Sequence, residues 1–265
     1  MIITLMTDFG TKDGYVGSVK GVLLKHAPQA QIIDITHEIP PFNIKQAAYT
    51  LLNYYDSFPR GTVHLIVVDP GVGSERKPLI VRTMNHYFVG PDNGVFNFIL
   101  KKEAYQAFEI RPELVNPAGY SSTFHGRDIF APAAALIASG MHVEQIASPL
   151  ERVVIDDRDE LVLEGNVCKA SIVSVDHFGN IIFALSRADL KHWKKAIKLV
   201  NFKNFKSDMI WDYYAQQEIG KPLVLWNSQN MLEIALSQGR AVDYFEADPD
   251  KDMIFIELMD VKEKK

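Results

Sequence analysis

Apolar residues in the first 70 positions form short continuous runs that alternate with stretches of helical periodicity. The runs at residues 1–6, 31–35 and 63–68 are rich in β-branched side chains, which is typical of buried strands. Between them, residues 15–26 and 44–55 place apolar side chains at helical spacing. The order strand, helix, strand, helix, strand predicts a mainly parallel α/β sheet with right-handed crossovers and helices on both faces.

The pattern after the third strand is less regular than a plain alternation of strands and helices. Residues 79–81 and 87–89 are two short apolar runs around Met84 and Asn85, which predicts a hairpin. A short apolar helix is expected at residues 95–100, and the Ala-rich stretch 131–139 predicts another.

From about Val153 the sequence changes to short β-like runs separated by frequent turn residues. We therefore expect a domain boundary between residues 150 and 165, with an α/β domain at 1–155 and a smaller antiparallel β-barrel or sandwich at 165–265. The strands expected in this second domain are residues 167–175, 181–185, 223–226, 231–236 and 253–258, with a helix at 187–196.

Composition restricts the function more than the fold. The 265 residues carry a net charge of −5 and no long basic run, so nothing neutralises phosphates as a nucleic-acid partner requires. The single cysteine, Cys168, excludes an internal disulfide and fits a reducing compartment. No apolar stretch reaches membrane-spanning length, and Met1 leads directly into the first strand without a charged leader. A cytoplasmic protein is expected.

Asp69 is the leading candidate for a functional residue because it ends the apolar run at 63–68. Ligands of open α/β sheets bind just outside the carboxyl ends of the strands. Gly71 and Gly73 allow close approach of the backbone to a ligand, and Arg76 can fold back to the aspartate. The alternative interpretation is a tight turn capped by an exposed ion pair.

Two further residues at element ends join this set. His125 directly precedes a predicted helix start, where the helix macrodipole disfavours imidazolium and leaves a ring nitrogen free to act as a base. If Asp69, Arg76 and His125 converge, they can hold a water molecule and accept its proton. Asp8 follows the first strand and could bind a ribose diol, although capping of the loop at residues 10–14 is equally compatible with its position.

Several familiar sites are excluded by the same sequence. The glycines after Asp69 lack the third glycine of a dinucleotide fingerprint, and there is neither a Walker lysine nor a serine at a nucleophile elbow. The histidines at 26, 37, 64 and 86 are scattered without metal-ligand spacing, so no metal is expected.

Six short motifs, in order along nearly the whole chain, resemble those of the S-adenosylmethionine hydroxide adenosyltransferases, relatives of the fluorinating and chlorinating enzymes. They are TDFG at 7–10, VDPGVG at 68–73, PDNG at 91–94, FHGRD at 124–128, DHFGN at 176–180, and NS at 227–228 with LEIA at 232–235. The resemblance implies an N-terminal α/β domain, a C-terminal β-barrel, and a homotrimer with sites between one subunit's N-domain and a neighbour's C-domain. It also implies hydrolysis of S-adenosyl-L-methionine to adenosine and L-methionine without a cofactor.

The resemblance assigns roles residue by residue. Asp69, Arg76 and His125 correspond to the set that positions and deprotonates the attacking water, whereas the halogenating relatives carry a tyrosine at the position of Asp69. The remaining positions correspond to substrate contacts. Ribose contacts are implied for Asp8 with Asp13 in the same loop, nucleoside packing for Phe42, adenine contacts for Phe178, Asn180 and Ala235, methionine contacts for Asp176 and Ser228, and a polar contact for Glu233. Gln229 stands where the halogenating relatives have an arginine, so the grip on the methionine carboxylate differs here.

Two other functions remain compatible with these residues. One is a halide-using enzyme of the same family, which Asp69 disfavours. The other is a non-catalytic protein that binds S-adenosylmethionine or adenosine.

Overall fold

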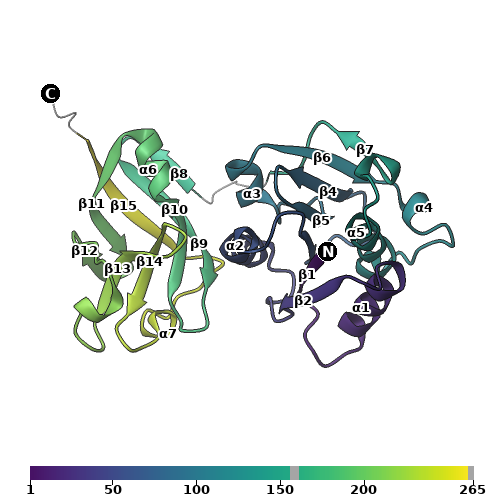
Figure 1. The fold of residues 1–265 in the computed structure, drawn as a ribbon. Helices are drawn as coiled ribbons and strands as arrows, with labels where there is room; N and C mark the ends of the chain where they lie inside the picture. The colour runs from purple at the N-terminus through teal and green to yellow at the C-terminus, as the bar shows by residue number, and fades with distance from the viewer. Residues whose placement is uncertain (156–160, 262–265) are drawn as a thin grey trace. The chain divides into compact units, whose positions relative to one another are not determined.

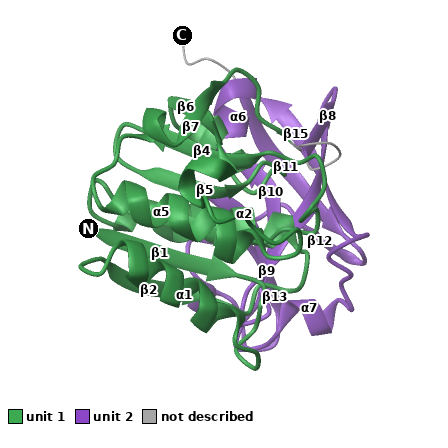
Figure 2. Ribbon diagram, turned by 90° about the vertical axis from the view of Figure 1, so that its right-hand side faces the viewer, with its two compact units in different colours: residues 1–156 green, residues 157–265 purple. Residues whose placement is uncertain are grey.

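The structure, a computed structural model, describes residues 1–155 and 161–261. The chain forms two compact units, unit 1 at Met1–Asp156 and unit 2 at Asp157–Lys265 (Figure 2). Unit 1 combines helices with a sheet, and unit 2 consists mostly of strands (Figure 1).

Unit 1 contains a seven-stranded sheet in the order β2-β1-β3-β5-β4-β6-β7. Its strands are β1 (Ile2–Thr7), β2 (Gln31–Thr36), β3 (Val63–Val67), β4 (Pro78–Thr83), β5 (Tyr87–Pro91), β6 (Tyr105–Ile110) and β7 (Ala147–Leu150). Its helices are α1 (Tyr15–His26), α2 (Ile44–Tyr54), α3 (Asn97–Lys102), α4 (Pro112–Val115) and α5 (Ala131–Ala138), the last preceded by a π-helical segment, Gly126–Phe130.

The α/β class is confirmed, and the sheet is mixed. Strands β2, β1, β3 and β5 are parallel, whereas β4, β6 and β7 pair antiparallel. The predicted hairpin is the reason for the change of direction. Only three residues join β4 to β5, and a connection that short can link antiparallel strands but not parallel ones.

The two faces of the sheet are covered by different helices, with α1 and α5 on one face and α2 on the other (Figure 1). Ile3, Leu5 and Leu65 pack with Val19 and Leu23 of α1 and with the small side chains of α5 in one fully buried cluster. The alanines of α5 permit close approach to the strands because they carry little side-chain volume beyond the backbone.

The parallel strands deliver three segments to one edge of the sheet. Thr7, the last residue of β1, pairs with Val67, the last residue of β3. On its other side β1 pairs with β2, which ends at Thr36. Asp8, Asp69 and His37 therefore follow neighbouring strand ends at the carboxyl edge of the sheet.

Unit 2 is a nearly closed antiparallel barrel. The strand order is β12-β11-β15-β9-β10-β14-β13, with β8 added on β9, and the end strands β12 and β13 contact each other. The strands are β8 (Leu161–Glu164), β9 (Val167–Val175), β10 (Ile181–Ser186), β11 (Lys195–Phe202), β12 (Phe205–Ser207), β13 (Pro222–Trp226), β14 (Met231–Leu236) and β15 (Met253–Asp260), and the helices are α6 (Arg187–Trp193) and α7 (Ala241–Tyr244). The expected barrel is confirmed.

One predicted boundary in unit 2 is wrong. The helix expected at residues 187–196 ends at Trp193, because Lys194 adopts a left-handed conformation with φ of 56° and β11 begins at Lys195. Ser186 and Asp189 form the capping box that starts this helix. No helix in the described part of the chain is both long enough and apolar enough to span a bilayer.

Candidate active site

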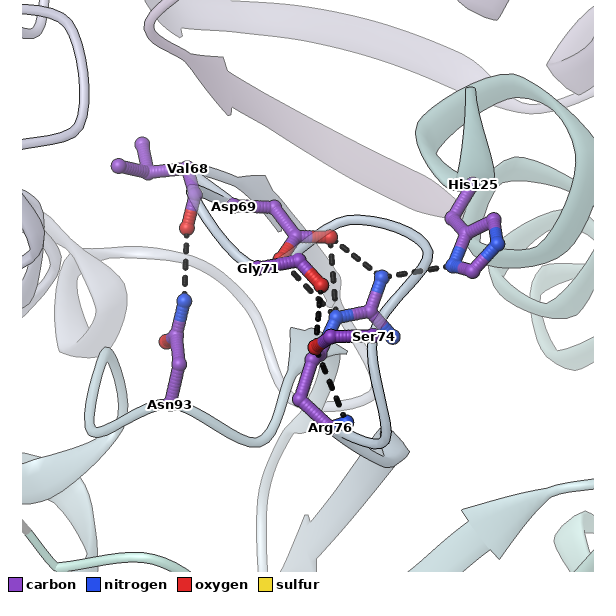
Figure 3. A network of polar contacts seen from close by, with 7 residues as sticks. All are labelled: Val68, Asp69, Gly71, Ser74, Arg76, Asn93 and His125. Atoms are coloured by element: carbon purple, nitrogen blue, oxygen red, sulfur yellow. Dashed lines mark hydrogen bonds and ion pairs between the residues drawn. The ribbon is translucent and has the colours of Figure 1, made fainter. Parts of the chain in front are cut away.

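Asp69 and Arg76 form a two-pronged ion pair at the end of β3 (Figure 3). Arg76 Nε donates to Asp69 Oδ1 at 2.9 Å and Oδ2 at 3.0 Å, and Arg76 Nη2 donates to Oδ2. The Asp69 side chain is 5% exposed and that of Arg76 is 9% exposed, so the pair is shielded from water. The alternative of an exposed ion pair on a turn is therefore wrong.

His125 joins the pair through the same guanidinium group. Arg76 Nη2 lies 2.8 Å from His125 Nδ1, and Figure 3 shows the ring facing the guanidinium. Arginine has only donors, so Nδ1 accepts and the proton of the neutral ring resides on Nε2. The structure thus brings the three predicted residues together, and Arg76 is the centre of the set.

The environment of His125 disfavours its charged form. Burial lowers the pKa of the imidazole, the Arg76 cation lowers it further, and Asp69 and Asp128 oppose the change. The direction agrees with the neutral histidine expected from the sequence, but the leading cause is burial rather than the helix macrodipole.

Close backbone packing explains how residues far apart in the chain meet here. Gly73 has φ of 80°, and a Cβ at this position would lie 2.5 Å from the carbonyl oxygen of Ser122, so only glycine lets the Asp69 loop lie against the segment that carries His125. Asn93 Nδ2 donates to the Val68 carbonyl at 3.0 Å and supports the end of β3. The Arg76 guanidinium also lies over the Phe130 ring, 5.0 Å from its centroid.

Two buried donors of this set have no hydrogen-bond partner among the described residues. They are Arg76 Nη1 and His125 Nε2. Buried N–H groups are almost always paired in native proteins, and an unpaired one is destabilising by roughly 1–3 kcal/mol. The set is therefore suited to bind a ligand or nucleophile that offers hydrogen-bond acceptors.

Asp8 lies close enough to Asp69 for the two charges to interact. Burial raises the pKa of Asp8, a hydrogen bond from the Phe42 backbone lowers it, and Asp69 adds a smaller upward contribution. Phe42 N–H donates to Asp8 Oδ2 at 2.9 Å, so the carboxylate holds the loop after β2. Asp13 is exposed in the loop before α1 and makes no hydrogen bond to Asp8 in the structure.

Phe42 has an unusual backbone conformation for its residue type. Its φ is 69°, and its ring is 69% exposed. Left-handed conformations of bulky residues are strained by about 1–3 kcal/mol and concentrate at functional sites. The strained backbone presents the ring outward beside Asp8.

Unit 2 contains a cavity of about 630 Å³ around the 176–180 turn. Asp176, Phe178 and Asn180 line it, as the resemblance to the family suggested for one ligand site. Asp176 accepts from Asn180 N at 2.8 Å and Asn180 Nδ2 at 2.9 Å, which closes the turn. Phe178 is 72% exposed, so an apolar ring faces the open cavity.

The other three predicted substrate residues of unit 2 lie on β14 or the turn before it. Glu233 is 2% exposed, and its pKa is raised to about 7. Burial is the main cause, and the nearby Asp176 charge also raises the pKa. The hydrogen bond that Tyr214 Oη donates to Glu233 at 2.8 Å lowers it. Ala235 is fully buried on β14, and Ser228 is exposed in the β13–β14 turn. None of these three lines the cavity directly.

Some residues at these sites carry little signal in the sequence. Tyr214 and Arg240 line the cavity of unit 2, and Arg240 Nη1 donates to the His177 carbonyl at 2.8 Å. The adjacent pair Tyr213 and Tyr214 in a polar segment was the only visible signal for the first. In unit 1, His37 contacts the end of β1, and the sequence around this isolated histidine does not indicate that contact.

Residues 1–155 and 161–261 contain no group of three or more His, Cys, Asp or Glu side chains arranged to hold a metal ion. The site combines a buried carboxylate, a guanidinium and a neutral imidazole.

The two units define a two-domain protein of the SAM hydroxide adenosyltransferase class, and the chain belongs to that family. The family's N-terminal domain matches residues 3–147, and its C-terminal domain matches residues 170–254.

Individual relatives agree with this assignment over nearly the full length. The (R)-S-adenosyl-L-methionine hydrolase of Methanocaldococcus jannaschii is 38% identical, covering 92% of this chain and 94% of the relative. The enzyme of the same name from Thermus thermophilus is 32% identical over 90% of this chain and 93% of the relative. A fluorinase from an Actinoplanes species is more distant, at 24% identity over 88% of this chain and 90% of the relative.

Solved structures show the same architecture. An uncharacterized conserved protein from Thermotoga maritima has a TM-score of 0.84 at 33% identity, covering 97% of this chain and 99% of that one. A conserved hypothetical protein from Thermus thermophilus has a TM-score of 0.77 at 29% identity with the same coverage.

Proposed function

We propose that this chain hydrolyses S-adenosyl-L-methionine to adenosine and L-methionine. A water oxygen forms a bond to ribose C5′ while the C5′–S bond breaks, and the electron pair of that bond stays on sulfur. The sulfonium becomes the neutral thioether of methionine, and the water loses one proton. The meeting of Asp69, Arg76 and His125 at one strand end carries this proposal, in a family whose relatives at 32–38% identity are named hydrolases of this substrate.

The hydrogen-bond directions assign each member of the set a task. Arg76 cannot accept a proton, and the Nδ1 lone pair of His125 is already engaged by Arg76. Asp69 is then the proton acceptor, because a carboxylate retains lone pairs after binding one guanidinium. One of the two buried donors without a partner among the described residues, Arg76 Nη1 or His125 Nε2, would orient the attacking oxygen by donating to one of its lone pairs, which leaves the other lone pair free to attack C5′.

The substrate contacts are proposed from the resemblance and the local geometry together. Asp8 would accept from the ribose hydroxyls, with Asp13 and Phe42 nearby in the same part of unit 1. Unit 2 would bind the remainder of the substrate. We assign adenine to Phe178, Asn180 and Ala235, the methionine amino and carboxylate groups to Asp176 and Ser228, and a polar contact to Glu233.

We further propose a cytoplasmic homotrimer that needs no cofactor. Each site would combine unit 1 of one subunit with unit 2 of a neighbour. The buried, unpaired Cys168 supports a reducing compartment. Light scattering coupled to size exclusion should return three times the 29.9 kDa chain mass, and a monomer at micromolar concentration would contradict the assembly.

Isotope transfer from water tests the reaction directly. Incubation with S-adenosyl-L-methionine in oxygen-18 water should yield adenosine labelled at the 5′ oxygen together with methionine. An unlabelled 5′ oxygen would eliminate attack by water, and 5′-chloro-5′-deoxyadenosine on addition of chloride would point to the halide-using alternative. Tight binding without any product would instead identify a binding protein.

A further inference from the structure

A chain of polar contacts borders the proposed site and takes no part in the reaction as proposed. Lys20 Nζ lies 2.5 Å from Asp34 Oδ2, and Asp34 Oδ1 lies 3.1 Å from His37 Nε2. On the other side of the ring, His37 Nδ1 lies 2.9 Å from the hydroxyl of Thr7, the residue directly before Asp8. His37 is 7% exposed and Thr7 is fully buried, so the inner part of this chain is shielded from water.

The Asp34 carboxylate decides which ring nitrogen of His37 carries the proton. Nε2 lies 3.1 Å from Asp34 Oδ1, an ion-pair distance without hydrogen-bond geometry, so the carboxylate favours the proton on Nε2 and Nδ1 accepts from the Thr7 hydroxyl. Thr7 Oγ1 in turn accepts from the Phe9 N–H at 3.3 Å. Partial burial of Asp34 disfavours its ionisation, but Lys20 and His37 outweigh that effect and lower its pKa, so the charge that orients His37 is maintained.

The same loop holds the segment around Asp8 at three points. The His37 side chain binds Thr7, the His37 carbonyl accepts from Gly10 N–H at 2.8 Å, and Phe42 N–H donates to the Asp8 carboxylate at 2.9 Å. One attachment lies on each side of Asp8 and one lies on its carboxylate. The orientation of Asp8 therefore depends on the loop that begins at His37.

We propose that His37 is a positioning residue, which holds Asp8 in the orientation that receives the two ribose hydroxyls of the substrate. The inference rests on the proposed function, because Asp8 is the ribose contact there. It adds a specific task to a buried histidine outside the Asp69 set. Asp34 is assigned the supporting task of fixing the His37 tautomer, as carboxylates do for metal-ligating histidines.

Discrimination between ribose and deoxyribose ligands tests this role without requiring turnover. Calorimetry should show that the wild-type protein binds adenosine more tightly than 2′-deoxyadenosine or 3′-deoxyadenosine, on the order of 10- to 100-fold for a lost hydrogen bond to a charged group. In His37→Ala we expect this ratio to fall toward 1, as in Asp8→Ala, with binding of the deoxy ligands changed less than threefold. The double variant should lose no more discrimination than Asp8→Ala alone, since both changes remove one interaction.

Two matched variants separate positioning from general damage. His37→Asn retains an acceptor close to the position of Nδ1, so it should recover part of the ratio. His142→Ala removes an exposed histidine of the same unit and should leave the ratio unchanged. If His37→Ala does not fold, the same affinities are measured for Asp34→Asn. This variant should reduce the affinity ratio between adenosine and the deoxyadenosines by several fold, because His37 is then less constrained.

The outcomes distinguish this inference from the proposed function. Equal loss of affinity for adenosine and both deoxy ligands in His37→Ala would assign His37 a merely structural role and overturn the inference alone. Unchanged discrimination would do the same. A wild-type protein that binds no adenosine, or binds all three nucleosides equally, would overturn the ribose role of Asp8 and the inference with it.

Discussion

The Asp69, Arg76 and His125 set of unit 1 and the cavity of unit 2 differ in their exposure to water. In unit 1 three polar side chains are hydrogen-bonded to one another and withdrawn from water, with the Asp69 side chain 5% exposed. In unit 2 a 72% exposed phenylalanine borders an open cavity of about 630 Å³. A preorganised polar cluster suits chemistry on a water molecule, whereas an exposed aromatic ring beside polar turn groups suits recognition of a flat base.

Burial also shifts the pKa of one titratable group in each unit, and the two shifts have opposite directions. Burial lowers the pKa of His64 in unit 1 to about 3 and raises that of Glu233 in unit 2 to about 7. Burial favours the neutral form of each group, but one is a base and the other an acid. Unit 1 should lose stability toward acid and unit 2 toward neutral pH. The predictions below separate the units by activity, by pH and by ligand affinity.

The largest effect is expected at Asp69. Asp69→Ala should lower turnover by roughly 100- to 10,000-fold, the usual contribution of general acid-base assistance, while adenosine affinity changes little. Single-turnover rates and calorimetry measure the two quantities.

A stability control is necessary because the variant leaves the Arg76 cation without its carboxylate. Asp69→Asn keeps the size and one acceptor oxygen of the side chain but removes its charge and its capacity to take up a proton, so a large loss of turnover at wild-type melting temperature would assign the effect to chemistry. Full activity of either variant would remove Asp69 from the reaction.

The next largest effect concerns the acid stability of unit 1. His64 is fully buried, its Nδ1 lies 2.8 Å from the Thr4 hydroxyl, and its ring stacks on Phe88 at 5.1 Å. Its pKa is near the ordinary 6.5 in the unfolded chain and about 3 in the fold, so the unfolded state binds the extra proton between these values. The stability of unit 1 should fall as pH drops from 6.5 toward 3, by up to about 5 kcal/mol.

Spectroscopy can follow this loss in one unit at a time. Unit 2 contains all three tryptophans, Trp193, Trp211 and Trp226, whereas unit 1 contains most of the helical residues. The helical circular dichroism signal in urea should therefore show the acid sensitivity, and His64→Phe should reduce it. A pH-independent helical transition in the wild type would contradict the assignment.

Glu233 should give a smaller effect of the opposite sign in unit 2. Its pKa is about 7 in the fold against 4.5 in the unfolded chain, so the folded state binds the extra proton between these values. Glu233 therefore makes its full contribution to the free energy of unfolding of unit 2 below pH 4.5. This contribution is lost as pH rises through 7, and the loss amounts to at most about 3 kcal/mol. Glu233→Gln, which keeps an acceptor for Tyr214, should abolish this slope in tryptophan fluorescence. A slope equal to that of the wild type would exclude Glu233 as its source.

The smallest effect is expected at Phe178. Phe178→Ala should weaken adenosine binding by about 1–3 kcal/mol, the usual contribution of base stacking on an aromatic side chain. The melting temperature should not change because the ring is largely exposed. Ile219→Ala removes another exposed apolar side chain of unit 2, at 71% exposure, and serves as the control. Equal affinity in the two variants would remove Phe178 from the binding surface.

Periodicity alone located most of the regular structure. The helix at Tyr15–His26 and the strands at Val167–Val175 and Met231–Leu236 have the bounds expected from the spacing of apolar residues. The periodicity of apolar residues is a weaker signal where a strand is short, exposed or interrupted. Strands β6, β11 and β12 were not anticipated, because their side chains alternate only partly between buried and exposed positions and sheet pairing stabilises them.

Asp69, Arg76 and His125 were each suggested by the sequence, two of them by their place at an element end and Arg76 by its reach back to Asp69. Arg76 binds Asp69 and His125 at once because Gly73 lies against Ser122, a contact between segments about 50 positions apart. The same holds for His37, which the sequence presents as an isolated histidine and the fold places on Thr7. Local pattern determined the elements and the residues at their ends, because periodicity and turn chemistry are properties of neighbouring residues. Tertiary packing alone decided which of those ends meet, which protons their side chains share, and how far burial shifts their pKa values.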